Sequence, residues 1–236
     1  MKNFFVILGG MGTKATESFV HLLNEKTPAS KDQDYLNYLL VNHATVPDRT
    51  AFLLGESDEN PATVLVEDIE QYSKLSPDFF VLTCNTAHRF YDELQAATSV
   101  PILHMPRIAV NEVINLFGTE KPINVGVLAT TGTISTGVYK EALARYKHLN
   151  VITPDEALQA EVMNLIYRDI KQANYMNTEL FFNILDTMMN EYQCDTIILG
   201  CTELSLIAEH VDLSAYEVVD AQLELVNQTI KRAKSN

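Results

Sequence analysis

The sequence predicts an α/β fold with two pseudo-symmetric domains, each with a mainly parallel four-stranded sheet flanked by helices, and an active site in the cleft between them. Three observations support this fold class. Short apolar runs alternate with longer stretches of helical period, the pattern of βα units. Motifs of the first half return in the same order in the second half. The length of 236 residues is compatible with two small domains, although by itself it also allows one large α/β domain.

Eight short apolar runs are the expected strands, and seven longer segments are the expected helices. The strands fall at residues 4–8, 38–42, 78–84, 101–104, 123–129, 150–153, 195–201 and 217–220. The helices fall at residues 15–26, 62–74, 87–97, 107–117, 156–172, 178–192 and 221–234. Asn60 and Thr153 each stand before a proline, which is tolerated in the first helical turn because an amide there has no partner. We therefore expect Asn60 and Thr153 to cap two of these helices.

The two halves repeat one plan, because three pairs of segments align at nearly constant offsets. The pairs are VILGGMGT (6–13) with GVLATTGT (126–133), DFFVLTCNT (78–86) with DTIILGCTE (195–203), and VPILH (100–104) with EVVDA (217–221). A constant offset is the signature of an internal repeat. We expect an N-terminal domain of residues 1–105 and a C-terminal domain of residues 106–220, with the final helix, residues 221–236, packing back on the first domain.

The charge balance argues against several classes of partner. The chain has 17 basic and 31 acidic residues, a formal net charge of −14, which repels phosphate backbones and anionic lipid. We therefore expect no nucleic-acid or membrane partner, and a small anionic ligand needs a local basic pocket. No apolar run approaches the roughly 20 residues of a membrane helix, and the run at residues 4–8 is too short for a secretion signal. We expect a cytoplasmic protein.

Cys84 and Cys201 are the candidate catalytic residues. Both follow strands at matching points of the repeat, and open α/β sheets bind ligands at the carboxyl ends of their strands. A helix follows each cysteine, and a helix N-terminus lowers a thiol pKa toward neutrality. Two thiols on opposite sides of a substrate predict two-base racemisation, in which one thiolate removes a proton from a carbon and the other thiol protonates its opposite face. A redox pair is the alternative.

Other candidate sites lack the pattern that their chemistry needs. Cys194 precedes its strand and is expected to be structural, and the three cysteines have no CxxC spacing for zinc. His43, His88 and His104 lie at strand ends without regular ligand spacing, so we expect no metal site. The GGMG segment is neither a dinucleotide-binding fingerprint nor a P-loop. Two-base racemisation itself needs no metal and no pyridoxal phosphate.

Four motifs carry a resemblance to a known family. They are GGMG at 9–12, followed by Ala15 and Thr16, NHATVPDRT at 42–50, TCNTAH at 83–88 and GCTEL at 200–204. In this order they resemble the cofactor-independent aspartate/glutamate racemases, most closely the aspartate racemases. The resemblance covers nearly the whole chain. It implies two α/β domains, a homodimer, no cofactor, and catalytic cysteines that correspond to Cys84 and Cys201.

The same resemblance implies the substrate contacts. Arg49 is expected to hold the side-chain carboxylate, a bidentate task that suits a guanidinium, and Lys171, with Tyr167 on the same helical face, is expected to close on that carboxylate. The α-carboxylate is assigned to Met11, Gly12, Asn85, Thr86, Thr130, Thr131, Thr133 and Thr202. His88 and Glu203 are supporting candidates, able to anchor a thiol or the substrate ammonium, although Glu203 is equally explained as a partner of the helix dipole.

Alternative functions stay open at this point. Glutamate or a broader set of acidic amino acids fits the same residues, because both substrates end in a carboxylate on a short stem. A hydantoin racemase or a maleate cis-trans isomerase shares the fold and both cysteines. A non-enzymatic alternative is a protein that binds or senses an acidic amino acid, although it leaves the matched thiols without a purpose.

Overall fold

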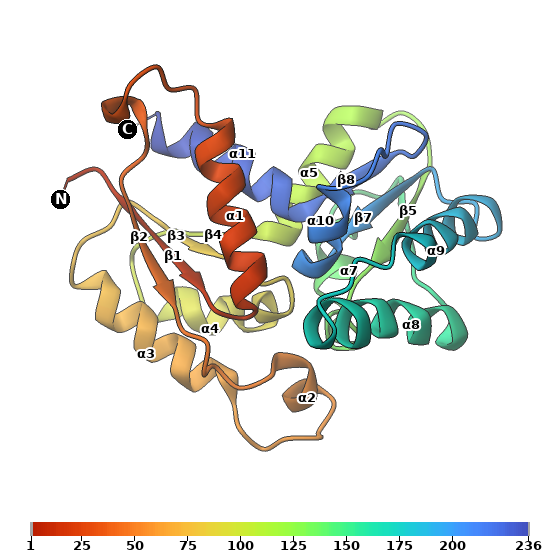
Figure 1. Ribbon diagram of the computed structural model, residues 1–236, viewed down its shortest axis with the longest axis horizontal. Coiled ribbons are helices and arrows are strands. Elements are labelled where there is room, and N and C mark those ends of the chain that lie inside the picture. The colour runs from red at the N-terminus through yellow and green to blue at the C-terminus, as the bar shows by residue number, and fades with distance from the viewer. Residues whose placement is uncertain (1, 236) are drawn as a thin grey trace. The chain divides into compact units, whose positions relative to one another are not determined.

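The computed structural model describes residues 2–235, which form two compact units (Figure 1). Unit 1 contains residues 2–105 and 225–235, and unit 2 contains residues 106–224. Each unit holds one parallel four-stranded sheet flanked by helices, which confirms the predicted α/β fold with two sheets. None of the helices found between residues 2 and 235 combines the length and the apolar character that crossing a membrane requires.

Unit 1 is built from the first half of the chain and the end of the last helix. Its elements are β1 (Phe5–Gly9), α1 (Thr13–Lys26), η1 (Asp32–Asp34), β2 (Tyr38–Asn42), α2 (Arg49–Leu53), α3 (Pro61–Ser73), β3 (Phe80–Leu82), η2 (Thr86–Phe90), α4 (Tyr91–Ala96) and β4 (Ile102–Leu103). The last helix, α11 (Ala221–Ala233), ends in this unit. There Arg232 lies 5.3 Å from the centre of the Phe79 ring, and Lys234 donates a hydrogen bond to the Pro28 carbonyl oxygen at 2.7 Å.

Unit 2 repeats this pattern of strands and helices. Its elements are α5 (Met105–Phe117), β5 (Ile123–Leu128), α6 (Thr131–Thr136), α7 (Val138–Leu143), β6 (Leu149–Ile152), α8 (Glu156–Met163), η3 (Asn164–Gln172), α9 (Thr178–Asn190), β7 (Thr196–Leu199), α10 (Thr202–Ala208) and β8 (Val218–Asp220). The first turn of α11 belongs to this unit as well.

Both sheets have the same strand order, β2-β1-β3-β4 and β6-β5-β7-β8. The register places Val6 of β1 beside Leu39 of β2 and Phe80 of β3, and Val125 of β5 beside Thr196 of β7. In each sheet the third strand therefore lies directly beside the first. Because the strands are parallel, the loops that follow these two strands leave the same edge of the sheet as neighbours.

Alternating side chains of each sheet build the cores. Even-numbered residues of unit 1, such as Val6, Leu8 and Phe80, are buried in a cluster with Leu65 of α3 and Leu94 of α4. Odd-numbered residues point to the opposite face, where α1 lies, because successive residues of a strand alternate between faces (Figure 1). In unit 2 the corresponding cluster joins β5 and β7 to α8, η3, α9 and α10.

Two predicted helices differ from the observed ones. The segment 87–97 is a 3₁₀ turn, η2, followed by the short helix α4, and 156–172 is α8 continued by the π-helical segment η3. In η3 the amide of Ala173 bonds the carbonyl oxygen of Arg168 at 3.1 Å, five residues back. The buried residues of η3, Leu165, Ile166, Asp169 and Ile170, recur every four residues. This spacing is close to the 3.6-residue period of an α-helix, so the sequence pattern does not distinguish a π-helix from an α-helix.

The cap predictions have mixed outcomes. Asn60 caps α3 as predicted, since its side chain accepts a hydrogen bond from the amide of Ala62 at 2.9 Å. The prediction for Thr153 is wrong: Asp155 caps α8 by accepting from the amide of Leu158 at 3.0 Å. The helices α2, α6 and α7, each only five or six residues long, were not predicted, because so few residues show no clear period.

Asp220 ends β8 and caps α11. Its Oδ1 accepts hydrogen bonds from Ser205 Oγ at 2.6 Å and from the amides of Gln222 at 2.9 Å and Leu223 at 3.3 Å. Burial raises the pKa of this carboxyl to about 6, although the three hydrogen bonds oppose the increase. The cap of α11 is therefore a carboxyl whose charged form is disfavoured by its surroundings.

We predict that Asp220→Asn makes the stability of the fold less sensitive to pH. The folded pKa is raised from 3.8 to about 6, so the folded state binds more protons than the unfolded state between these values. The free energy of unfolding should therefore fall as the pH rises through this window. Asn keeps the acceptor oxygen and removes the charge. In urea unfolding from pH 4 to pH 8, the variant should lose less stability than the parent, by up to about 3 kcal/mol.

Asp212→Asn is the matched control, because Asp212 is exposed and a backbone hydrogen bond from Ser214 lowers its pKa. Asp212→Asn should not reduce the loss of unfolding free energy between pH 4 and pH 8. Parallel pH curves for the parent and Asp220→Asn would contradict the prediction.

Candidate active site

The turn after β1 is fixed by Gly10 and Thr16. Gly10 has φ of 93°, and a Cβ at this position would lie 2.4 Å from the backbone of the loop after β2, so only glycine fits. Thr16 Oγ1 accepts from the amide of Gly10 at 3.0 Å and donates to the carbonyl oxygen of Gly12 at 2.9 Å. It also lies 3.2 Å from Thr83 Oγ1. Thr16 thus connects the first turn to the residue before Cys84.

Arg49 joins two loops of unit 1. Its Nη1 donates to the carbonyl oxygens of Val46 at 3.2 Å and Pro47 at 2.9 Å, and its Nη2 donates to that of Met11 at 2.7 Å. The residue is only 8% exposed. The structure therefore brings Arg49 together with the predicted contact Met11, and it gives the guanidinium three backbone partners that the sequence did not reveal.

Cys84 lies in a turn that His88 holds in place. The thiol-bearing residue is 6% exposed and follows β3 by two positions. His88 Nδ1 lies 2.8 Å from the Cys84 carbonyl oxygen, and its Nε2 accepts from the amide of Met105 at 3.1 Å. Because Nε2 accepts a hydrogen bond, the ring hydrogen belongs on Nδ1 and is donated to Cys84. The predicted contacts Asn85 and Thr86 are buried in the same turn.

The loop that carries Arg49 begins at a second histidine. His43 Nδ1 lies 2.7 Å from the carboxylate of Asp68, a buried residue of α3. Asp68 was missed as a site residue. The signal was present in the sequence, since Asp68 lies between Leu65 and Ile69 on the apolar face of its predicted helix, where a carboxylate needs a partner.

Five predicted residues of unit 2 form one cluster. Cys201 Sγ donates to Glu203 Oε2 at 3.0 Å, and Lys171 Nζ lies 3.5 Å from Glu203 Oε1. Lys171 Nζ also lies 4.5 Å from the centre of the Tyr167 ring, a cation–π contact. Thr202 adds a hydrogen bond from its Oγ1 to Glu203 Oε2 at 3.3 Å. Lys171 is an exposed residue, and its ammonium group is held at the cluster by Glu203 and the Tyr167 ring.

The expectation that a helix N-terminus lowers the pKa of Cys201 is wrong. Cys201 is the N-cap of α10, yet its thiol pKa is raised well above the usual value. Burial is the largest cause, and the negative charge of Glu203 adds to it, whereas Lys171 lowers the pKa. Burial, together with the Glu203 carboxylate in the first turn of the same helix, therefore sets the direction of the shift.

The turn after β5 is the counterpart of the first turn. Thr130 caps α6, since its Oγ1 accepts from the amide of Thr133 at 3.2 Å. The amide of Thr131 bonds Met163 Sδ at 3.2 Å, and Thr131 Oγ1 accepts from Gln159 Nε2 at 3.4 Å. The three predicted threonines thus lie in one turn, ordered by α8.

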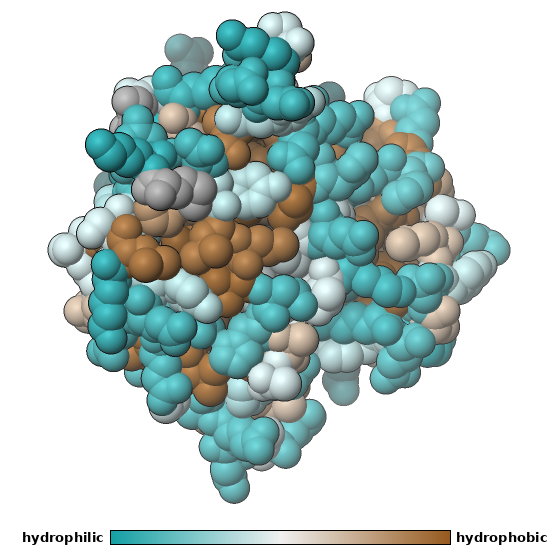
Figure 2. All heavy atoms as spheres, turned by 60° about the vertical axis from the view of Figure 1, so that its left-hand side comes forward, coloured by the Kyte–Doolittle hydropathy of each residue, from teal (hydrophilic) through white to brown (hydrophobic). Residues whose placement is uncertain are grey.

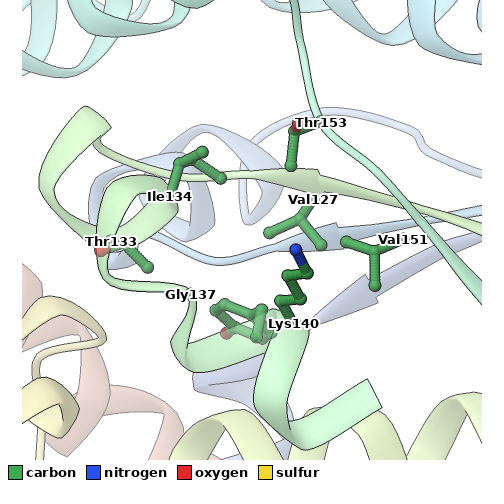
Figure 3. Close-up of a pocket in the computed structure, with 8 residues that line it drawn as sticks. Val127, Thr133, Ile134, Gly137, Lys140, Val151 and Thr153 are labelled. Atoms are coloured by element: carbon green, nitrogen blue, oxygen red, sulfur yellow. The ribbon is translucent and has the colours of Figure 1, made fainter. Parts of the chain in front are cut away.

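A cavity of about 290 Å³ lies beside this turn (Figure 3). Val127 and Val151 come from adjacent strands, and Lys140 reaches toward them from α7. The other lining residues are Thr133, Ile134, Gly137, Tyr139 and Thr153. The buried Tyr139 ring also packs against Gly200, where an added Cβ would lie 2.8 Å from Tyr139 Cε2. Burial raises the pKa of Tyr139 well above its usual value, and Asp220 and Cys201 add to the increase.

Within residues 2–235, no group of three or more His, Cys, Asp or Glu side chains is arranged to hold a metal ion. His88 and His104 do approach each other, with ring centres 5.1 Å apart. His88 is occupied by the backbone bonds described above. Cys194 is buried beneath α9, and burial raises its pKa to about 11.

Comparison with known proteins gives one consistent family. Residues 8–229 match the Asp/Glu/hydantoin racemase family. The broad-specificity amino-acid racemase RacX of Bacillus subtilis is 30% identical over 231 residues, which cover 95% of each chain. A glutamate racemase of Pediococcus pentosaceus is 29% identical over 161 residues, 64% of this chain and 56% of that protein.

Solved structures show the same fold. The aspartate racemase of Picrophilus torridus superposes with a TM-score of 0.81 at 28% identity, over 98% of this chain and 94% of its own. The glutamate racemase isoform RacE1 of Bacillus anthracis gives a TM-score of 0.68 at 18% identity, over 98% and 81% of the two chains.

Proposed function

Because the chain belongs to the Asp/Glu/hydantoin racemase family and is an amino-acid racemase, we propose that it interconverts L- and D-aspartate, with Cys84 and Cys201 as the two acid–base groups. The observation that carries this proposal is the position of the two thiols. Cys84 follows the third strand of one sheet, Cys201 follows the third strand of a sheet with the same order, and each third strand lies beside a central first strand. A reaction that needs one proton acceptor and one proton donor fits such a duplicated arrangement.

In the proposed reaction the thiolate of one cysteine takes the Cα proton of the substrate. The thiol of the other cysteine donates its proton to the opposite face of Cα, which inverts the centre. The two cysteines exchange roles for the opposite enantiomer. The chemistry consists of two proton transfers, and no electron leaves the substrate.

The substrate carboxylates need cationic and hydrogen-bonding partners, and the predicted residues are proposed for these roles. Arg49 and Lys171 are proposed to hold the side-chain carboxylate. The turn residues of the two sheets are proposed to hold the α-carboxylate: Met11, Gly12, Asn85, Thr86, Thr130, Thr131, Thr133 and Thr202. Support comes from the clustering of these residues within each unit at the carboxyl ends of the strands.

We predict that Cys84→Ser and Cys201→Ser each abolish racemisation in both directions. Every turnover uses one thiolate and one thiol, so losing either group should lower kcat by roughly 10²- to 10⁴-fold. The measurement is polarimetry from pure L- and pure D-aspartate. Cys194→Ser is the matched control, because it removes a buried thiol outside both turns and should keep the parental rate. A single variant at Cys84 or Cys201 with full rates in both directions would exclude the two-thiol mechanism.

A second candidate is racemisation of a broader range of amino acids. Two observations favour it: a relative of broad specificity is 30% identical over 95% of the chain, and the proposed carboxylate ligands are engaged within the protein, Arg49 by three carbonyl oxygens and Lys171 by Glu203. A neutral side chain would leave these contacts intact. An acidic side chain would have to replace some of them.

Exchange in deuterated water separates these candidates. Purified protein without added cofactor is incubated with L-aspartate, L-glutamate, L-alanine, L-leucine and L-lysine, and each is scored for deuterium at Cα and for inversion. We predict the highest kcat/KM for aspartate, and Arg49→Ala should lower it roughly 10- to 100-fold more than that for alanine, since a bidentate charged hydrogen bond is lost. A general loosening of the loop would lower both values equally. Exchange with none of the five would reject a racemase in favour of a binding protein.

We also propose that the chain forms a homodimer, supported by an apolar surface on unit 1. Figure 2 shows hydrophobic side chains gathered on the side of the molecule that carries β2 and α3. Edge strand β2 exposes 41% of Leu40, and an apolar edge strand is a typical pairing site. Sedimentation at micromolar concentration should show a dimer in the parent and a shift toward monomer in Leu40→Lys. A parent that sediments as a monomer would contradict the proposal.

A further inference from the structure

The Glu203 carboxylate is the shared partner of a thiol, a hydroxyl group and an ammonium group. Its Oε2 accepts from Cys201 Sγ at 3.0 Å and from Thr202 Oγ1 at 3.3 Å, and its Oε1 lies 3.5 Å from Lys171 Nζ. The Glu203 side chain is 6% exposed, whereas that of Lys171 is 25% exposed. A buried carboxylate therefore contacts the thiol directly, while the cation that balances its charge lies nearer to solvent.

This arrangement favours the protonated thiol of Cys201. A thiol donates a hydrogen bond to a carboxylate, but a thiolate at 3.0 Å would place two negative charges side by side at a buried position. Tyr139 of α7, a neutral phenol, also interacts electrostatically with Cys201 and Asp220. Lys171 is the positive group that opposes this effect, because it lowers the pKa of Cys201.

We propose, on the basis of the two-thiol function above, that Glu203 is a positioning residue that keeps Cys201 protonated in the resting enzyme. Cys84 then acts first as the base. Lys171 sets how strongly the proton of Cys201 is held.

Each half-cycle then has a defined direction. The Cys84 thiolate takes the Cα proton of one enantiomer, and the S–H bond of Cys201 breaks as its proton forms the new C–H bond. Release of product leaves a Cys201 thiolate beside Glu203. Repulsion from the carboxylate favours its reprotonation, while Cys84 loses the proton that it took from the substrate. The opposite enantiomer needs the Cys201 thiolate, the less populated form.

Steady-state kinetics report this asymmetry. Enantiomers have equal free energies, so kcat/KM must be the same in both directions for any variant. The KM of each enantiomer varies inversely with the fraction of enzyme in the protonation form that binds it. A change in these fractions therefore raises the KM of one enantiomer and lowers that of the other. Because kcat/KM is equal in both directions, the ratio of the two kcat values changes by the same factor as the ratio of the two KM values. A substitution that only loosens the site changes the KM values of both enantiomers in the same direction.

The test combines Glu203→Gln, Lys171→Met and the control Glu209→Gln, which makes the same charge change at an exposed position just beyond α10. Two quantities are measured: the ratio of KM for L-aspartate to KM for D-aspartate, and the ratio of iodoacetamide alkylation rates at Cys201 and Cys84, from peptide masses. Alkylation reports the thiolate fraction and needs no turnover. Glu203→Gln should change both ratios roughly tenfold, the alkylation ratio upward, since a hydrogen bond to a charged group is lost.

Lys171→Met should change the alkylation ratio in the opposite direction, because loss of the cation favours the thiol, and Glu209→Gln should change neither ratio. Loosening of the fold would accelerate alkylation in both Glu203→Gln and Lys171→Met. The predicted effect on the Cys201 proton instead changes the alkylation ratio in opposite directions in these two variants. An alkylation ratio unaffected by Glu203→Gln, or equal changes in both KM values, would overturn the proposal. If the parent racemises no amino acid, the proposed function fails, and the alkylation ratios alone decide whether Glu203 holds the proton of Cys201.

Discussion

Parallel pairing around a central strand is the constraint on which the candidate site depends. β1 and β5 each have neighbours on both sides, and the third strand of each sheet is one of them. A parallel strand delivers its next residues to the same edge as its neighbour, so the turn after β1 must lie beside the turn that carries Cys84. The Thr16–Thr83 contact at 3.2 Å is the local result. The same rule brings the Thr130 turn to the edge where Cys201 stands.

Within this common frame the two units treat their thiols differently. Cys84 is held through its backbone, by a histidine whose two ring nitrogens are both engaged with main-chain atoms. Cys201 is held through its side chain, by a carboxylate two residues later. The repeat therefore supplies equivalent positions, while the first residues of each following helix supply different electrostatics. The sequences TCNTAH and GCTEL already contain this difference, since a histidine follows the first cysteine by four positions and a glutamate follows the second by two.

Strands, sheet class and clusters of site residues were predictable because they depend on apolar period and on motif order. The π-helical hydrogen bonding of η3 was not predictable, because its buried residues, Leu165, Ile166, Asp169 and Ile170, have the spacing of an ordinary amphipathic helix. The raised pKa of Cys201 was also out of reach. The position of Cys201 before a helix predicts a lowered thiol pKa, whereas its three-dimensional surroundings, burial and the Glu203 carboxylate, raise that pKa. Likewise, the three carbonyl partners of Arg49 come from two loops. One partner, Met11, lies 38 residues before Arg49 in the sequence, and no periodic pattern encodes such a contact.

The engagement of Arg49 bears directly on how the proposed acidic substrate would be recognised by a chain of net charge −14. The surface field opposes a dianion, so short-range contacts must provide the binding energy. Three neutral carbonyl oxygens orient the guanidinium before any ligand arrives, which reduces the entropy lost on binding. A carboxylate is a stronger acceptor than a carbonyl oxygen and can compete for the same donors. Lys171 differs, because its present partner is already a carboxylate. A substrate that draws Lys171 away would exchange one ion pair for another and leave Glu203 with two neutral donors, the Cys201 thiol and the Thr202 hydroxyl group. Recognition of an acidic side chain would thereby be linked to the protonation of the thiol.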